Sequence, residues 1–391
     1  MKTAQRLARI EPYLFMKLRK KIADARKAGI DVISLAIGDP VEPTPKAVVD
    51  ELCRAAADPA NHRYPTDEEK GMLSFRQAVA RWYADRYGVT LDAAGEILAL
   101  IGSKEGVHHF CLAVVDPGDV VLMTDPGYPA YRASITIAGG VPEEVAIRAR
   151  NNFLMDFSEI PSATAKKAKA IFLNYPNNPT GAVATRKFFA DLVRWAREYD
   201  VIVCHDNPYS EIVFGAERLS FLSADGARSV GIELNSLSKP YNMTGWRIGM
   251  AMGSPDVIAA MSKVKENTDS GIFNAVQYAG IKALTAANDN VPRMLDIYKR
   301  RAEMLVSTLK ACGMTAEPPR GTFYLWVGVP AGKTSSAFAE EIFDKASVVV
   351  ASGTGYGKNG EGFVRFSLTV PDDRLKEACA RMTRAFGRQG A

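Results

Sequence analysis

Short, continuously apolar segments recur along the chain, and they constrain its fold more than any other feature. Strands that are apolar throughout, rather than on alternate residues, are buried on both faces of a sheet. Stretches with helical character separate these segments, which predicts a doubly wound α/β domain with a large, mostly parallel sheet. The segments are Val32–Ile37, Ile97–Ile101, Val120–Met123, Ala170–Leu173, Val201–Cys204, Ile232–Leu234 and Ile248–Met252.

One helix of this domain can be placed from its apolar spacing. Val107, Phe110, Cys111 and Val114 follow the i, i+3, i+4, i+7 pattern of an amphipathic helix. Small polar residues commonly accept hydrogen bonds from the first free N–H groups of a helix. Ser103 is therefore expected to be the N-cap.

The pattern changes near residues 288–292, where a long helix begins and continues to Gly313. Three strand-like segments follow it, and a further helix is expected at residues 335–345. Because 391 residues exceed one typical domain, we expect a large domain over residues 45–290 and a smaller α+β domain that contains residues 291–391. The apolar face of the long helix consists of Leu295, Tyr298, Ala302, Leu305 and Leu309, and the strand-like segments are 322–327, 348–351 and 363–368.

Charge and composition exclude several kinds of protein. The net charge of +5 is spread along the chain, and the densest basic run, Lys17–Lys21, lies in a stretch typical of a solvated amphipathic helix. No apolar run is long enough for a signal peptide or a membrane span, and the first serine is Ser34, which is atypical of a transit peptide. We therefore expect a cytoplasmic protein that binds neither nucleic acid nor membrane.

The cysteines and histidines indicate neither disulfides nor a metal. The cysteines are scattered without paired spacing, and His108 and His109 are adjacent, so they point to different sides of a helix. Reduced thiols and no metal site are expected. The cysteines are Cys53, Cys111, Cys204, Cys312 and Cys379.

The candidate chemistry centres on residues 236–247, Ser-Leu-Ser-Lys-Pro-Tyr-Asn-Met-Thr-Gly-Trp-Arg. Lys239 lies among small hydroxyl residues, and Arg247 follows eight positions later. A lysine forms a Schiff base with a carbonyl only where its amine can be neutral, and a fixed cation nearby suits an aldehyde cofactor that carries a phosphate. We interpret Lys239 as that amine.

A carboxylate candidate, Asp206, follows the apolar run that ends at Cys204. A carboxylate that faces a pyridine nitrogen keeps it protonated, so that the ring can draw electrons from a substrate carbon. Ser103, Asn178 and Lys239 also lie just after apolar runs. Ligands of open α/β sheets bind beyond the carboxyl ends of the strands, so these side chains are expected at one edge of the sheet.

Three segments carry a resemblance to a known family: Asn174–Gly181, His205–Tyr209 and Ser236–Arg247. In this order and spacing they resemble the pyridoxal-phosphate-dependent aminotransferases of fold type I, classes I and II. The resemblance implies that Asn178 and Tyr209 donate hydrogen bonds to the ring oxygen of pyridoxal 5'-phosphate. It also implies that Tyr128 stacks on the ring.

The phosphate of such a cofactor needs donors and positive charge. The helix that starts at Ser103 offers free N–H groups, Ser236 and Ser238 offer hydroxyls, and Arg247 offers a fixed cation. Tyr64 resembles the family tyrosine that reaches the phosphate of a neighbouring subunit. The resemblance therefore implies a homodimer with shared active sites.

The resemblance also implies contacts to the amino acid and 2-oxo acid substrates. Arg365 matches the arginine that grips the α-carboxylate, a planar anion suited to two parallel N–H bonds, and Gly38 matches the glycine that approaches the same group. Tyr13 and Lys104 match residues that face the substrate, and Lys104 borders the cofactor as well. Tyr128 and Asn178 complete the expected substrate contacts.

Within the aminotransferases, the resemblance is strongest to the LL-diaminopimelate aminotransferase family, which also implies that residues 1–44 form an N-terminal arm and part of the small domain. It rests on residues 102–106, 236–247, 269–271 and 360–365. One departure is the loop Tyr64–Gly71, which is two residues longer than in the family and carries Asp67, Glu68 and Glu69. That loop contacts the substrate in the family. The donor therefore stays open between diaminopimelate, with 2-oxoglutarate as acceptor, and a shorter donor such as glutamate, aspartate or alanine.

Competing motifs are weaker. Gly355–Gly360 has G-x-G-x-x-G spacing but precedes a strand-like segment, so no helix follows to receive a pyrophosphate. Ser236–Lys239 has the S-x-x-K pattern of penicillin-recognising hydrolases, whose S-D-N element is absent.

The motifs together favour ping-pong transamination, in which the freed Lys239 moves the α-proton. A β-eliminating or decarboxylating enzyme on the same fold is the alternative. A pyridoxal-phosphate-binding regulator is disfavoured, because we find no appended DNA-binding segment.

Overall fold

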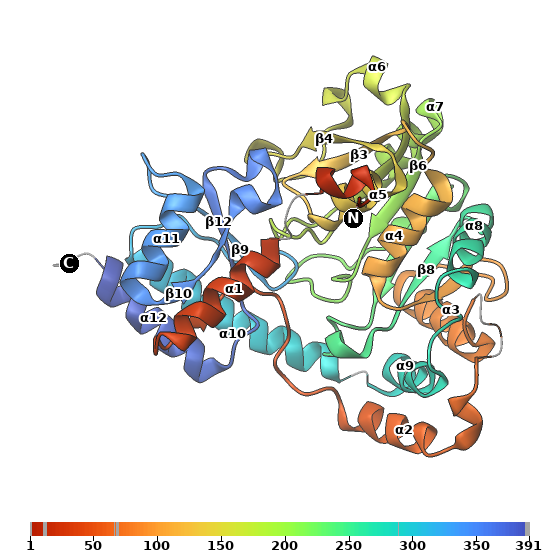
Figure 1. Ribbon diagram of the computed structural model, residues 1–391, viewed down its shortest axis with the longest axis horizontal. Coiled ribbons are helices and arrows are strands. Elements are labelled where there is room, and N and C mark those ends of the chain that lie inside the picture. Colours follow the sequence, from red (N-terminus) through yellow and green to blue (C-terminus); the bar gives the residue numbers. More distant parts are fainter. Residues whose placement is uncertain (1, 11–13, 66, 68–69, 288, 388–391) are drawn as a thin grey trace.

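The computed structural model describes residues 2–10, 14–65, 67, 70–287 and 289–387. Its largest sheet has seven strands in the order β2-β8-β7-β6-β5-β3-β4 (Figure 1). The neighbours from β7 through β4 pair in parallel, whereas β8 is antiparallel to both β7 and β2. The strands are Ile97–Leu100 (β2), Val120–Asp125 (β3), Val141–Ala146 (β4), Ala168–Leu173 (β5), Ile202–Asp206 (β6), Gly231–Ser236 (β7) and Gly249–Gly253 (β8).

Helices cover both faces of this sheet. Successive residues of a strand point to opposite faces, so the neighbours of one strand's residues show which helices lie on each face. On β5, Ile171 and Leu173 pack with α3, α7 and α9, whereas Ala170 and Phe172 pack with α4, α5 and α8. The predicted doubly wound, mostly parallel α/β fold is confirmed. These helices are Leu73–Tyr87 (α3), Ser103–Val114 (α4), Ala130–Ala138 (α5), Arg186–Tyr199 (α7), Pro255–Glu266 (α8) and Asn274–Ala286 (α9).

Two smaller sheets lie apart from the large one. Three antiparallel strands have the order β11-β12-β9, and β1 pairs in parallel with β10. Helices α10, α11 and α12 pack against them in a separate apolar cluster. The elements are Ile33–Ser34 (β1), Tyr324–Gly328 (β9), Val348–Val349 (β10), Ala351–Ser352 (β11), Phe363–Ser367 (β12), Asn290–Ala311 (α10), Ser335–Ala346 (α11) and Asp372–Phe386 (α12).

Helix α10, cyan in Figure 1, links the apolar cluster of the large sheet with that of the smaller sheets. Val291 near its start packs with the large sheet, whereas Tyr298 and Leu305 pack with α11 and α12. Helix α1 lies beside the smaller sheets and packs on residues that include Val349 and Ala351. None of the helices in the described part of the chain is long and apolar enough to cross a membrane. The remaining helices are Leu14–Lys27 (α1), Lys46–Ala56 (α2) and Ser162–Ala165 (α6).

Three local predictions differ from the structure. Residues 32–37 do provide a strand, β1, but it pairs with β10 outside the large sheet. Strand β4 is missed by the apolar-run criterion because, as the edge strand, it is largely exposed or half-buried along its length. Ser103 is the first helical residue rather than the N-cap, which is Gly102 at φ 80°.

The glycine-rich segment after β11 forms two short 3₁₀ turns, Gly353–Tyr356 and Lys358–Gly360. Strand β12 follows them directly. The prediction that this segment is a turn rather than a dinucleotide site is consistent with this arrangement, since no helix begins there.

Candidate active site

Most of the predicted site residues line one cavity of about 520 Å³ at the carboxyl edge of the large sheet. The lining residues from β5, β6 and β7 lie at or just beyond the last residues of these strands, and α4 begins beside them. The predicted residues that line the cavity are Gly38, Ser103, Lys104, Tyr128, Asn178, Asp206, Tyr209, Ser236, Ser238, Lys239 and Arg247.

Lys239 lines the cavity, and the pKa of its amine is shifted from the ordinary value. Its Nζ donates a hydrogen bond to the carbonyl of Gly38 at 3.0 Å. The pKa of Lys239 is lowered to about 8, mainly by burial; the charge of Asp39 opposes this shift, and the charges of Arg247 and Arg365 contribute to it. Roughly a tenth of this amine is therefore neutral at pH 7, far more than for an ordinary lysine, as a carbonyl-capturing lysine requires.

Asp206 also lines the cavity. Its Oδ2 accepts a hydrogen bond from the Tyr131 hydroxyl at 2.8 Å, whereas Oδ1 has no hydrogen-bond partner among the described residues. Burial raises the pKa of Asp206 to about 6, partly offset by the hydrogen bond from Tyr131. A buried carboxylate with one unpaired oxygen matches a protonated ring nitrogen.

Hydroxyls and a cation gather beside the start of α4. The Ser236 hydroxyl donates to Ser238 Oγ at 2.9 Å, and Arg247 Nη2 donates to the carbonyl of Ile101 at 3.1 Å. Gly102 lies against that guanidinium: a Cβ there would be 2.4 Å from Arg247 Nη2, and its φ of 80° is strained for other residues. Backbone N–H groups at a helix start, two hydroxyls and an arginine make a cradle that fits a phosphate.

Arg365 lies behind the cavity wall rather than in the lining. It is fully buried and donates to Asn178 Oδ1 and to the carbonyl of Ala36, both at 2.6 Å, while its Nε has no partner in the described chain. The centroid of the Tyr324 ring lies 3.8 Å from the guanidinium carbon. The structure therefore places Arg365 in contact with Asn178, one side chain away from the cavity.

Tyr64, like Arg365, is not among the residues that line the cavity. Its side chain is 77% exposed. Tyr13 lies outside the described residues, as do Glu68 and Glu69. Asp67 of the same loop forms an ion pair with Arg76 at 3.1 Å, so the negative charge of Asp67 is compensated.

Several lining residues were not predicted. Phe15, Met16 and Arg19 of α1 reach the cavity from the far end of the chain, and Tyr324 comes from β9. No local motif marks them, because only the tertiary arrangement of α1 and of the smaller sheet that contains β9 brings them to the cavity. Asn174, by contrast, lies in a segment that the motifs had singled out.

A buried charged cluster supports the start of α4. Glu105, His109 and Asp269 lie within 4.8 Å of one another, but the ammonium of Lys265 occupies the cluster, at 2.9 Å from Glu105 and 2.8 Å from Asp269. Glu105 also accepts a hydrogen bond from the backbone N–H of Ile101. The lysine satisfies these carboxylates, so the cluster is structural.

Comparison with known proteins gives a consistent result. The family model described as "Aminotransferase class I and II" matches residues 30–382. An LL-diaminopimelate aminotransferase of Moorella thermoacetica is 51% identical over 389 residues, 99% of each chain. Substrate-bound BacF from Bacillus subtilis has a TM-score of 0.95 at 34% identity over 100% of both chains. A probable N-succinyldiaminopimelate aminotransferase from Thermus thermophilus has a TM-score of 0.89 at 36% identity over 95% of this chain and 100% of its own.

The fold and the cavity define a pyridoxal-phosphate-dependent enzyme of fold type I. The chain belongs to the class I and II aminotransferases, which exchange an amino group between an amino acid and a 2-oxo acid. It is similar over nearly its whole length to LL-diaminopimelate aminotransferases.

Proposed function

We propose that this aminotransferase moves the amino group of LL-diaminopimelate to 2-oxoglutarate by a ping-pong mechanism. The full-length identity of 51% to the enzyme of that name carries the proposal. Two local observations support it: Lys104 lines the cavity, and the charge of Asp67 is paired with Arg76 rather than free to repel a distal carboxylate.

Pyridoxal phosphate, when bound, supplies an aldehyde for amine capture and a ring that accepts electron density from the substrate's α-carbon. Lys239 would hold it through Nζ, Asp206 would face its ring nitrogen, and Tyr128 would cover its ring. Asn178 and Tyr209 would donate hydrogen bonds to the oxygen on the cofactor ring. The phosphate would be held by Ser103, Ser236, Ser238, Arg247 and the partner's Tyr64, and Lys104 would border the cofactor on the side of the substrate.

The substrate would be positioned by groups around Lys239. Arg365 would take the α-carboxylate on its guanidinium, near Gly38, in place of one of its present carbonyl and amide acceptors. Lys104, Tyr128 and Asn178 would complete the pocket together with Tyr13. Lys239, released from the cofactor, would accept the α-proton at Nζ, a transfer that suits an amine whose pKa is lowered to about 8.

The proposed functional unit is a cytoplasmic homodimer. Large apolar side chains are exposed beside the cofactor-binding part of the chain, among them Tyr64 at 77%, Phe273 at 45% and Leu73 at 44%. Aromatic side chains are enriched in protein interfaces, and the exposure of Tyr64 and Phe273 supports this assembly. We further propose the division into residues 1–44 with 291–391 as the small domain and 45–290 as the large one, supported by the separate apolar clusters.

A panel of amino donors tests the proposed substrate. Purified holoenzyme would be supplied with LL-diaminopimelate, aspartate or alanine and 2-oxoglutarate, and glutamate formation would be followed. Glutamate itself would be tested with pyruvate and oxaloacetate as acceptors. We expect the highest kcat/KM with LL-diaminopimelate and no product with Lys239→Ala. A higher kcat/KM with a shorter donor would overturn the substrate, and ammonia release without glutamate would indicate a β-eliminating enzyme.

A further inference from the structure

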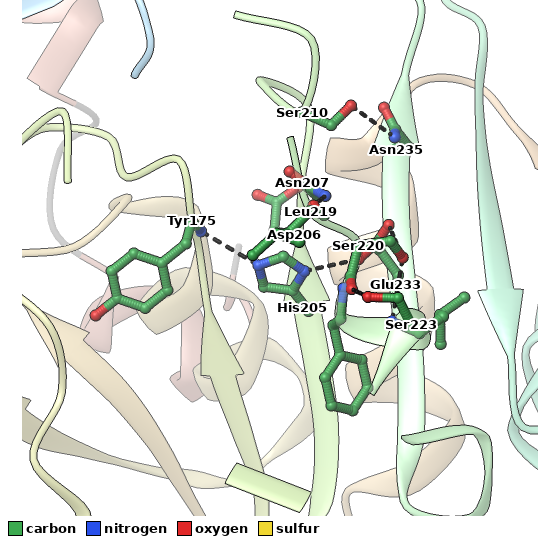
Figure 2. Close-up of polar contacts among 12 residues, drawn as sticks. Tyr175, His205, Asp206, Asn207, Ser210, Leu219, Ser220, Ser223, Glu233 and Asn235 are labelled. Atoms are coloured by element: carbon green, nitrogen blue, oxygen red, sulfur yellow. Dashed lines mark hydrogen bonds and ion pairs between the residues drawn. The ribbon is translucent and has the colours of Figure 1, made fainter. Parts of the chain in front are cut away.

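A fully buried pair of ionisable side chains lies on the strands that carry Asp206 and Ser236, outside the cavity lining, and takes no part in the roles above. His205 on β6 and Glu233 on β7 are opposite each other in the sheet, both 0% exposed, with His205 Nδ1 2.9 Å from Glu233 Oε2 (Figure 2). The residue after His205 is Asp206, which faces the cavity. Buried ionisable groups are costly unless fully hydrogen-bonded, so their other partners indicate what they do.

Glu233 has every oxygen lone pair occupied. Its Oε1 accepts from the hydroxyls of Tyr83 at 2.8 Å and Ser220 at 3.0 Å, and its Oε2 accepts from the backbone N–H of Phe221 at 2.8 Å as well as from His205. A carboxylate has about four such sites. With four donors in place it has no site for a proton of its own, so the bond to His205 requires a proton on Nδ1.

The opposite nitrogen of His205 must be an acceptor. Its Nε2 lies 3.3 Å from the backbone nitrogen of Tyr175, and Figure 2 shows the imidazole between Tyr175 and Glu233. A backbone N–H can only donate. The partners therefore fix His205 as the neutral imidazole with its proton on Nδ1, since a proton on Nε2 would set two N–H groups against each other.

Tyr175 begins the turn that carries Asn178. That turn is also tied to the end of β6 by Asn174, whose Nδ2 donates to the carbonyl of Asp206 at 2.6 Å and whose Oδ1 accepts from the backbone of Asn178 at 2.7 Å. His205 supplies a second, independent link between the same two segments. The strand end with Asp206 and the turn with Asn178 are thus held together at two points.

We propose that Glu233 and His205 are positioning residues of this aminotransferase. Glu233 holds His205 in its neutral tautomer, and His205 Nε2 holds the backbone at Tyr175, which sets Asn178 relative to Asp206. This inference rests on the cofactor contacts proposed for Asn178 and Asp206.

Two substitutions of the histidine separate its two nitrogens. In His205→Asn the amide can still donate to Glu233 from near the Nδ1 position, but nothing reaches Tyr175. In His205→Gln the longer side chain can bring its oxygen to Tyr175. The readouts are the Kd for pyridoxal phosphate of the reconstituted chain and the pH midpoint of the bound cofactor's visible absorbance. We expect His205→Asn to raise Kd about three- to tenfold and to shift the midpoint by about half a pH unit, with His205→Gln within about twofold of wild type.

Tyr83→Phe is the matched control, because it removes one donor from Glu233 without touching His205. It should lower Tm while leaving Kd and the midpoint unchanged. Should His205→Asn fail to fold, Glu233→Gln provides a second test. This substitution keeps the side-chain volume but changes the hydrogen bonds that residue 233 can accept, so it is expected to shift the Kd and the pH midpoint in the same direction as His205→Asn. Equal effects of the two His205 variants, or an equal effect of Tyr83→Phe, would overturn the proposal. A wild-type chain that binds no pyridoxal phosphate at Lys239 would overturn the proposed cofactor roles instead.

Discussion

The floor and the mouth of the cavity are built in different ways. At the floor, Asp206 is 4% exposed and accepts a hydrogen bond from Tyr131 of helix α5. On the strands that carry the floor, outside the cavity lining, His205 and Glu233 are 0% exposed and are hydrogen-bonded to each other and, through His205, to the backbone of Tyr175. The mouth, by contrast, is lined by the exposed side chains of Met16, Arg19 and Lys104. The residues that carry the chemistry are therefore part of the packed core. Substitutions at the mouth, by contrast, can change which amino donor the enzyme prefers with little effect on its stability.

The largest expected effect tests the floor. Lys239→Ala should reduce transamination by at least about 10⁴-fold, because it removes the amine that captures the cofactor and carries the α-proton. Circular dichroism and Tm of the variant should show an intact fold. A variant that kept near-wild-type turnover would place the reactive amine elsewhere and remove the distinction between floor and mouth.

A smaller loss is expected at the carboxylate of the floor. Asp206→Ala should slow α-proton abstraction by about 10²- to 10⁴-fold, since the ring nitrogen would lose its anionic partner. Single-turnover kinetics with a good donor measure that step. Cofactor affinity should change much less, and Asp206→Glu should retain more activity than the alanine variant. Unchanged single-turnover rates would contradict the role of Asp206.

Effects at the mouth should depend on the donor. Lys104→Ala should lower kcat/KM for LL-diaminopimelate about 10- to 100-fold, the size of one lost charge-assisted contact of about 1.5–3 kcal/mol, and leave alanine nearly unaffected. Lys17→Ala, an exposed lysine of α1 outside the cavity lining, is the control. Equal losses for both donors would assign Lys104 to the cofactor or the fold.

The smallest effect concerns pH. Only the neutral amine of Lys239 captures an aldehyde, and its pKa is lowered to about 8 by burial. The rate at which the cofactor-free enzyme binds added pyridoxal phosphate should therefore rise about fivefold from pH 7 to pH 8 and level off above pH 9. A rate that kept rising about tenfold per pH unit to pH 10 would indicate an ordinary, solvated lysine.

The floor could be predicted from the sequence because its residues follow apolar strands in recognisable motifs. Asp206 and Lys239 each come at or just after the end of a strand of the large sheet, and the carboxyl ends of parallel strands meet at one edge. The hydrogen bond from Tyr131 to Asp206 and the position of Arg365 behind Asn178 were not predictable. Both depend on side-chain packing between segments remote in sequence.

The mouth was harder to predict for a related reason. Phe15, Met16 and Arg19 are ordinary positions of an amphipathic helix, and only tertiary packing of α1 brings them to the cavity. In the loop at residues 65–70, Asp67 is paired with Arg76, which a count of charges along the sequence does not reveal, whereas Glu68 and Glu69 lie outside the described residues. A strand such as β4, half-exposed at the sheet edge, lacks the apolar run by which its neighbours were found.

The role of Lys239 is tested most directly by locating the lysine that holds the cofactor. The pyridoxal-phosphate-loaded enzyme would be reduced with borohydride, digested, and mapped by mass spectrometry for the phosphopyridoxyl group. We predict the label on the peptide that contains Lys239. A label on Lys104 or Lys265 with Lys239 unmodified would contradict this assignment.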